Sequence, residues 1–78
     1  MPQLAHLAIN DEGFVFDPTR GDSFQVSPTG LLILVALRSG KADEEIAHSL
    51  VENYEVSLED AQRDVTDFRA NLKHLGLM

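Results

Sequence analysis

The sequence predicts an α+β fold, a winged helix-turn-helix in which a three-stranded antiparallel wing precedes three helices. Three observations predict it. Before residue 27, short runs of β-forming residues alternate with turn signals. After it, serine residues stand where two helices are expected to begin. The run Leu31–Leu37 is apolar on nearly every side, as in a helix that other elements enclose. Because 78 residues allow one modest core, we expect a single domain over residues 1–78.

The expected wing consists of three short strands. Leu4–Ile9 is apolar with partial alternation and predicts the first strand, and Phe14–Phe16 predicts the second because it is rich in β-forming residues. The sequence Asn-Asp-Glu-Gly between them is typical of a turn. In Ser23–Val26 polar and apolar residues alternate, which predicts a third strand with Phe24 and Val26 on its buried face.

The first two helices are predicted by their ends. Ser27 is a suitable N-cap and Pro28 suits the first helical position, while Gly40 is the residue type that favours a helix end. The second helix is expected from about Asp43, where three consecutive acidic residues favour the positive end of a helix dipole. Its expected apolar stripe consists of Ile46, Ala47, Leu50 and Val51.

The third helix is expected to begin after Ser57, because Asp60 three residues later completes a shortened capping box. Its expected apolar stripe consists of Ala61, Val65, Phe68, Leu72 and Leu75. One flank of the stripe is acidic, with Asp60, Asp64, Asp67 and Asn71, and the other is mildly basic, with Leu58, Gln62, Arg69 and Lys73. An ordinary solvated face with ion pairs three or four residues apart explains the same pattern.

The charge of the chain argues against a nucleic-acid partner. Thirteen acidic side chains face six basic ones, for a formal net charge of −7. DNA-binding proteins draw most of their affinity from Lys and Arg that neutralise phosphates, so a duplex would be repelled. The order of elements resembles that of a DNA-binding winged helix-turn-helix, but the chain lacks the positive charge that DNA binding requires. This combination favours a peptide as the bound polymer.

The sequence also indicates a protein without catalytic chemistry. It has no cysteine, and His6, His48 and His74 lie on different elements at spacings that do not form a metal site. The carboxylate clusters fall in turns and first helical turns, where turn and capping chemistry explains them. We therefore expect no enzyme activity, no cofactor and no metal. Without a signal peptide or a long apolar run, we expect a cytoplasmic protein that does not contact membranes.

One feature of the wing suggests binding. A three-stranded wing leaves an open edge, and an open edge offers unpaired backbone groups to an incoming strand. If the strand Ser23–Val26 lies beside the third helix, the two would form a groove for an extended peptide. The alternative, a short edge that is simply hydrated, has equal standing from the residues alone.

Several motifs occur together in one order along the chain. They are the runs Gly13–Asp17 and Phe24–Gly30, then Ser39-Gly40, Glu45-Ile46-Ala47 with Leu50, and Asp64-Val65 with Phe68, Leu72 and Gly76-Leu77. Taken together, these motifs resemble the PqqD family from about Leu7 to Met78. The family usually has asparagine where this chain has Ser27, and often leucine where it has Arg69, which makes one flank of the last helix more polar.

The resemblance implies a fold, a partner and a site. Members of the family have a three-stranded wing followed by three helices, and they bind the leader of a precursor peptide as an extra strand on the third wing strand, against the third helix. They present the peptide to a modifying enzyme, often a radical S-adenosylmethionine protein. Carried onto this chain, the resemblance implicates Ser23, Phe24, Gln25 and Val26 as the docking strand and Asp64, Phe68, Asn71 and Leu75 on the helix.

The resulting hypothesis is a non-catalytic peptide-binding chaperone or adaptor. Two alternatives come from other classes of function. One is a transcription regulator that binds nucleic acid, against which the net charge argues. The other is a structural oligomerisation module, for example a homodimer that pairs through the same strand edge.

Overall fold

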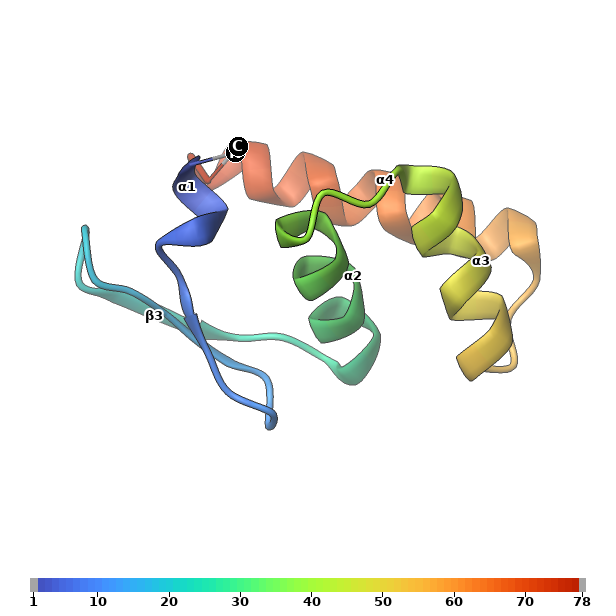
Figure 1. The fold of residues 1–78 in the computed structure, drawn as a ribbon, viewed down its shortest axis with the longest axis horizontal. Coiled ribbons are helices and arrows are strands. Elements are labelled where there is room, and N and C mark those ends of the chain that lie inside the picture. The colour runs from blue at the N-terminus through green and yellow to red at the C-terminus, as the bar shows by residue number, and fades with distance from the viewer. Residues whose placement is uncertain (1, 78) are drawn as a thin grey trace.

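The computed structural model describes residues 2–77, and its helices and strands follow the expected α+β order (Figure 1). The elements are α1 (Pro2–Ala5), β1 (Ala8–Ile9), β2 (Phe14–Asp17), β3 (Asp22–Gln25), α2 (Pro28–Arg38), α3 (Asp43–Asn53) and α4 (Leu58–His74). The predicted three-stranded antiparallel sheet followed by three helices is thus confirmed, with one short helix added at the start.

The three strands form one sheet in the order β1-β2-β3, with both neighbouring pairs antiparallel. Ile9 lies opposite Val15 in β2, and Val15 lies opposite Phe24 in β3. These three residues therefore share the face of the sheet that is turned toward the core, where Val15 is almost fully buried. Because β3 pairs with β2 on one side only, its other side is an edge of the sheet in residues 2–77.

The predicted first strand over Leu4–Ile9 is wrong in its first half. Its start belongs to α1, and the amide of Leu7 donates to the carbonyl of Leu4 at 3.2 Å. Both leucines are buried in the core. In a strand, residues three apart point to opposite faces, whereas a helical turn puts them on the same side. Burial of both leucines therefore favours a helical turn, and the strand is reduced to Ala8–Ile9.

The predicted helix starts are confirmed in their capping contacts. Ser27 Oγ accepts the amide of Gly30 at 3.1 Å, and Ser57 Oγ accepts the amide of Asp60 at 3.1 Å. Each contact satisfies one of the amides that a first helical turn leaves free. Both helices thus begin where the sequence indicates.

The helices bury most, but not all, of the apolar residues that the sequence assigns to their stripes. The buried residues of these three helices are Gly30, Ile33, Leu34, Ala36 and Leu37 in α2, Ile46, Ala47 and Leu50 in α3, and Ala61, Val65 and Leu72 in α4. Two assignments to the buried stripes are wrong, because Val51 is 37% exposed and Leu75 is 47% exposed. Val51 lies at the margin of its stripe, and Leu75 is the residue that caps α4 at its C-terminal end.

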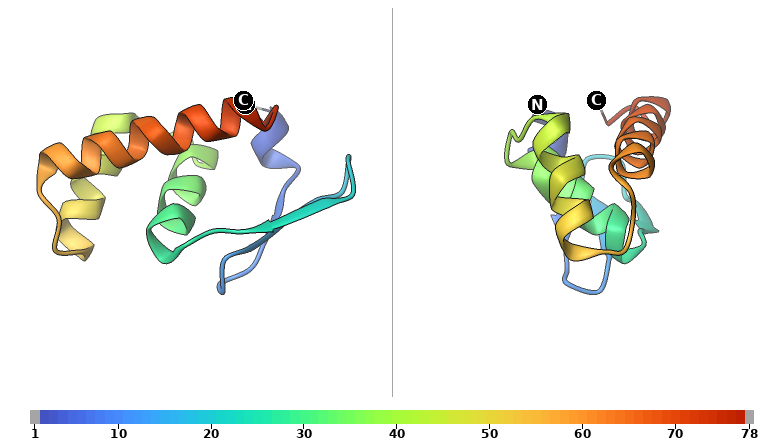
Figure 2. Two further views of the ribbon diagram at one scale, coloured as in Figure 1. Left: turned by 180° about the vertical axis from the view of Figure 1, so that it is seen from behind. Right: turned by 90° about the vertical axis from the view of Figure 1, so that its right-hand side faces the viewer.

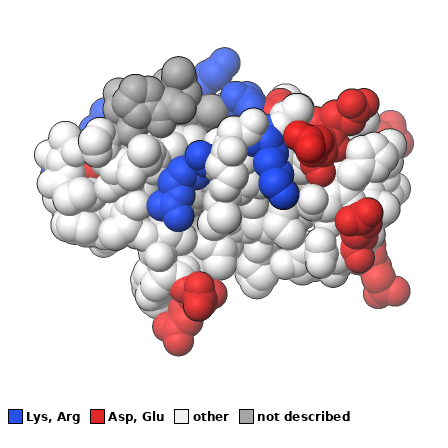
Figure 3. All heavy atoms as spheres, viewed as in Figure 1, with Lys and Arg blue, Asp and Glu red and all other residues white. Residues whose placement is uncertain are grey.

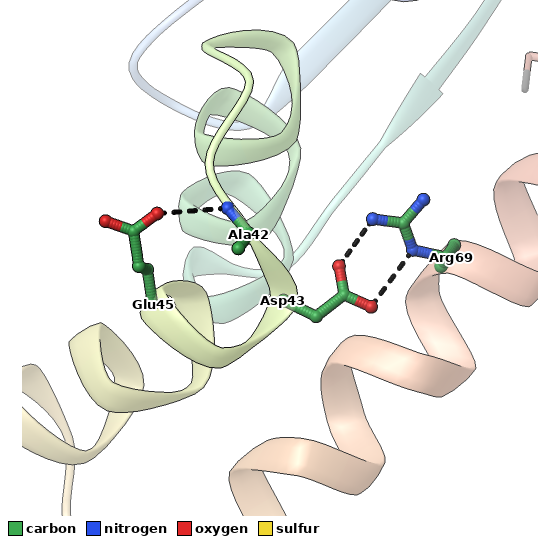
Figure 4. A network of polar contacts seen from close by, with 4 residues as sticks. All are labelled: Ala42, Asp43, Glu45 and Arg69. Carbon is green, nitrogen blue, oxygen red and sulfur yellow. Dashed lines mark hydrogen bonds and ion pairs between the residues drawn. The ribbon is translucent and has the colours of Figure 1, made fainter.

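Helix α4 runs along the length of the molecule, and α3, α2 and the sheet follow one another beneath it (Figure 2). An ion pair fixes one part of this arrangement. Both Arg69 Nε, at 3.2 Å, and Arg69 Nη2 donate to the carboxylate of Asp43 in the first turn of α3 (Figure 4). Glu45 accepts the amide of Ala42 at 3.1 Å, which completes the start of that helix. Arg69, expected on the mildly basic flank of the last helix, is engaged with α3.

A prediction on stability follows from the tight turn before β2. Gly13 has φ +93°, and a Cβ at this position would lie 2.5 Å from the carbonyl oxygen of Val26. Gly21, with φ +76°, has open space around the same position. Gly21→Ala should cost about 1–2 kcal/mol from the left-handed backbone alone, and Gly13→Ala should cost clearly more because the backbone of β3 must also move. Thermal unfolding of both variants measures the difference, and equal losses would contradict this packing.

Candidate functional site

A groove lies between the edge strand β3 and helix α4. It has a volume of about 350 Å³ and is lined by Phe24, Gln25, Val26, Ser27, Phe68, Asn71, Leu72, His74 and Leu75. Six of the eight residues that sequence reasoning assigned to a binding site line it, all except Ser23 and Asp64. The expected arrangement of the third strand beside the last helix is therefore present.

The backbone of β3 alternates between pairing with β2 and facing the groove. The amide of Val26 donates to the carbonyl of Gly13 at 2.9 Å, so these two residues form a hydrogen-bonded pair. In an antiparallel ladder such pairs alternate with pairs that make no mutual bonds. Phe24 therefore bonds to β2, while the N–H and C=O groups of Ser23 and Gln25 point out of the sheet at its open edge.

The side chains that line the groove form apolar walls on both sides. On the strand side, Phe24 and Val26 are half-buried and pack against the core. On the helix side, Phe68 is half-buried, and its Cε1 lies 3.2 Å from the position that a Cβ on Gly30 would occupy. Leu75 is largely exposed and extends the apolar wall past the end of α4. An extended chain in this groove would find apolar contacts beside unpaired backbone groups.

Asp64 lies beside the groove rather than in it. It lines a neighbouring hollow of about 230 Å³, together with Ser27, Thr29, Gly30, Ile33, Asp67, Phe68 and Asn71. Phe68 and Asn71 line both hollows, so the two are continuous. Among residues 2–77, neither Asp64 nor Asp67 forms an ion pair. The groove therefore ends in an acidic margin at the first turn of α2.

The side chain of Ser23 faces away from the groove. Ser23 lies opposite Phe16 and lines a hollow on the outer face of the sheet with residues of β1 and β2. Only its backbone is directed toward the open edge. The strand alternation that buries Phe24 sets this direction, since neighbouring side chains of a strand point to opposite faces.

Near Leu75, an arginine from the turn between β2 and β3 contacts the end of α4. Arg20 Nη1 donates to the carbonyl oxygen of Leu75 at 2.6 Å, at the C-terminal end of α4. A cation suits this position because the last carbonyls of a helix carry partial negative charge. The contact joins the tip of the hairpin to the helix and holds the two walls of the groove together.

Sequence reasoning missed three residues of the groove, namely Ser27, Leu72 and His74. The first two were expected only as a helix cap and a core residue. His74 is exposed and follows Asn71 by three residues, so both lie on the same face of α4. That spacing is a signal that could have placed His74 in the groove.

Two classes of feature are absent from the described part of the chain. Within residues 2–77, no group of three or more His, Asp or Glu side chains is placed to hold a metal ion. None of the helices there is both long enough and apolar enough to cross a membrane.

Comparison with known proteins assigns the chain to a family. The family model described as coenzyme PQQ synthesis protein D (PqqD) matches residues 12–78. A solved structure named lasso peptide synthetase B1 complexed with the leader peptide is 32% identical, with a TM-score of 0.77, and the match covers 90% of this chain and 84% of that one. A second, TbiB1 in complex with the TbiA(beta) leader peptide, is 28% identical with a TM-score of 0.78, over 91% of this chain and 84% of that one. No curated protein matches the chain.

The groove wall yields a prediction on stability. Phe68→Ala should lower the free energy of unfolding by about 2–3 kcal/mol, less than a fully buried phenylalanine because the side chain is half-buried. Leu75→Ala is the matched control on the same wall, and it should cost less than about 1 kcal/mol because that side chain is 47% exposed. Urea unfolding measures both. A Phe68→Ala variant as stable as the native protein would show that this residue does not join the groove to the core.

Proposed function

This chain belongs to the PqqD family, and on that premise we propose that it is a non-catalytic adaptor for a precursor peptide. The leader of the peptide docks as an added strand on β3, and the adaptor presents it to a modifying enzyme. The observation that carries this proposal is the open edge of β3. There the N–H and C=O groups of Ser23 and Gln25 face outward beside an apolar groove.

The physical basis of the proposal is strand addition. The backbone of an incoming strand can pair with the two outward-facing residues of β3, which gives affinity for any extended peptide. Every second side chain of that strand then points into the groove, toward Phe24, Phe68 and Leu75. Because these side chains are apolar, the groove favours leaders with apolar residues at alternate positions.

The roles of the eight implicated residues follow from their positions. Ser23 and Gln25 contribute their backbone, and Phe24 and Val26 contribute the strand side of the groove. Phe68, Asn71 and Leu75 form the helix side, and Asp64 stands at the acidic margin. We assign all of residues 1–78 to this one recognition domain.

The similarity to the two solved structures supports a leader peptide as the ligand. Both are named as complexes with leader peptides, and this chain covers 84% of each of them. We infer that the second partner is the enzyme that modifies the bound precursor, for which a radical S-adenosylmethionine protein is one type, and that both partners meet the adaptor in the cytoplasm.

A nucleic-acid partner is disfavoured by the surface of α4. Its acidic flank carries Asp60, Asp64 and Asp67, and both of its arginines are paired with carboxylates, Arg63 with Asp60 and Arg69 with Asp43. A net charge of −7 adds long-range repulsion from phosphates. The helix that would enter a DNA groove in a winged helix-turn-helix is thus unsuited to it.

The first functional prediction concerns the backbone of β3. Gln25→Pro should weaken leader binding by about tenfold, because proline removes an outward-facing N–H and its ring obstructs the incoming strand. Gln25→Ala is the matched control and should change the affinity by less than about twofold, since it retains the N–H. Both variants should remain folded, because proline is tolerated at a sheet edge. Fluorescence anisotropy with a labelled leader peptide that carries apolar residues at alternate positions measures the affinities.

The same titration followed by NMR locates the site. Shifts should concentrate in residues 22–27 and in α4, where the groove lies. Shifts confined to α3, or an equal loss of affinity in the proline and alanine variants, would contradict strand addition.

The second functional prediction concerns selectivity. Asp64→Lys should shift the preference of the groove from a leader with a lysine beside the acidic margin toward one with glutamate there, by about two- to fivefold, because opposite charges at an exposed site attract weakly. Glu52→Lys makes the same change in net charge on α3, away from the groove, and should leave the preference unchanged. Competition between the two leaders at low salt measures the ratio. An identical shift in both variants would show an effect of net charge alone.

A further inference from the structure

The outer face of the sheet carries two exposed phenylalanines. Phe14 and Phe16 alternate with the buried Val15, so both point away from the core. They are 52% and 44% exposed. A single exposed apolar residue is ordinary, but two large aromatic rings on one face of a four-residue strand form a patch of the kind that marks an interaction site.

The two rings lie beside a hollow of about 280 Å³. It is lined by Ala8, Ile9, Asn10, Phe14, Val15, Phe16 and Ser23, and none of these side chains is charged. We call the surface formed by Ala8, Phe14, Phe16 and Ser23 the outer sheet face; Ile9 and Val15 border the hollow, but their side chains belong to the core-facing side of the sheet. The hollow lies on the opposite side of the sheet from the groove, whose apolar lining includes Phe24 on the core side of β3.

The outer sheet face is continuous with the edge at which we propose that the leader docks. Phe16 lies opposite Ser23, and Phe14 lies opposite Gln25. A strand added to that edge would extend the sheet, and every second side chain of it would stand on the outer face beside these pairs. A protein that covers the two phenylalanines would therefore also contact the bound leader.

The charges around the outer sheet face indicate the chemistry of its partner. Asp11 and Glu12 lie in the turn between β1 and β2, and both are exposed. Acidic side chains stand out on the lower protrusion of the molecule in Figure 3, where Figure 1 shows this turn. A second copy of the chain would bring like charges together, with a net charge of −7 on each copy. A partner with Lys or Arg around an apolar centre is complementary.

We propose that the outer sheet face is the docking surface for the enzyme that modifies the bound peptide, and that this enzyme contacts it through an apolar surface ringed by Lys or Arg. The inference rests on the proposed function, because it names the second partner of the same edge. It also implies coupling. A leader that extends the sheet adds contacts for the enzyme, so the enzyme binds the loaded adaptor more tightly than the empty one, and by reciprocity it tightens the leader.

The test uses the full chain, a leader peptide that it binds and the purified enzyme that modifies the corresponding precursor. In the double variant Phe14→Thr and Phe16→Thr, threonine keeps the strand propensity and removes the apolar rings. Enzyme binding, measured by biolayer interferometry with and without leader, should weaken at least tenfold, whereas leader affinity should change less than twofold. Val51→Thr is the matched control on α3, since Val51 is also exposed, at 37%, and it should leave both affinities unchanged.

The charge of the partner is tested in the same assay. Raising the salt concentration, or introducing Asp11→Lys with Glu12→Lys, should slow association of the enzyme, because both weaken the attraction of opposite charges. An association rate that neither change affects would overturn the basic rim that we propose for the enzyme.

Three outcomes separate this inference from the function on which it rests. Equal enzyme affinity for the native chain and the phenylalanine double variant would overturn the inference. So would a native dimer in sedimentation equilibrium that the double variant abolishes, because a second copy would then be the occupant. Failure of the leader to bind the native chain would contradict the proposed function instead, and a loss of leader-free enzyme binding in the double variant would still support the outer sheet face.

Discussion

The structure depends on how α4 is held beside β3 without pairing with it. A helix satisfies its backbone internally, so it cannot continue the hydrogen-bonded ladder of a sheet. Val65 and Leu72 anchor α4 in the core, Arg69 ties it to α3, and Arg20 ties its end to the hairpin. These contacts fix the helix close enough to form a wall, yet the outward backbone groups of β3 stay available. The groove is the consequence.

Much of the fold is predictable because its signals are local. Ser27 and Ser57 each cap the helix that follows through an amide three residues away, and such a contact needs no distant partner. The predictions that are wrong concern residues whose conformation depends on packing against distant parts of the chain. Leu4 and Leu7 are apolar enough for a strand, but both side chains are buried in the core, on the same side of the backbone. A helical turn places residues three apart on one side, whereas a strand does not. Leu75 continues the helical spacing past the point where the helix ends.

The site was predictable in its composition and less so in its geometry. The resemblance to the PqqD family named the strand and helix, and six of the eight implicated residues line the groove. Which residues of β3 offer their backbone depends on the pairing of Val26 with Gly13 across the sheet. A shift of that register by one residue would exchange the roles of Phe24 and Gln25. The alternation in Ser23–Val26 predicts the buried face of Phe24, but sequence alone does not determine which amides of the strand point outward.

The two flanks of α4 make different contacts, and this difference reconciles the acidic charge of the chain with a binding role. On the basic flank Arg69 is engaged with Asp43, so it serves the fold. On the acidic flank Asp64 and Asp67 border the groove and form no ion pair within residues 2–77. A DNA reader needs the reverse, with cations free and carboxylates engaged. A strand-addition site draws its affinity from backbone groups, which carry no net charge, so its side chains can be acidic without loss of binding and remain free to select among peptides.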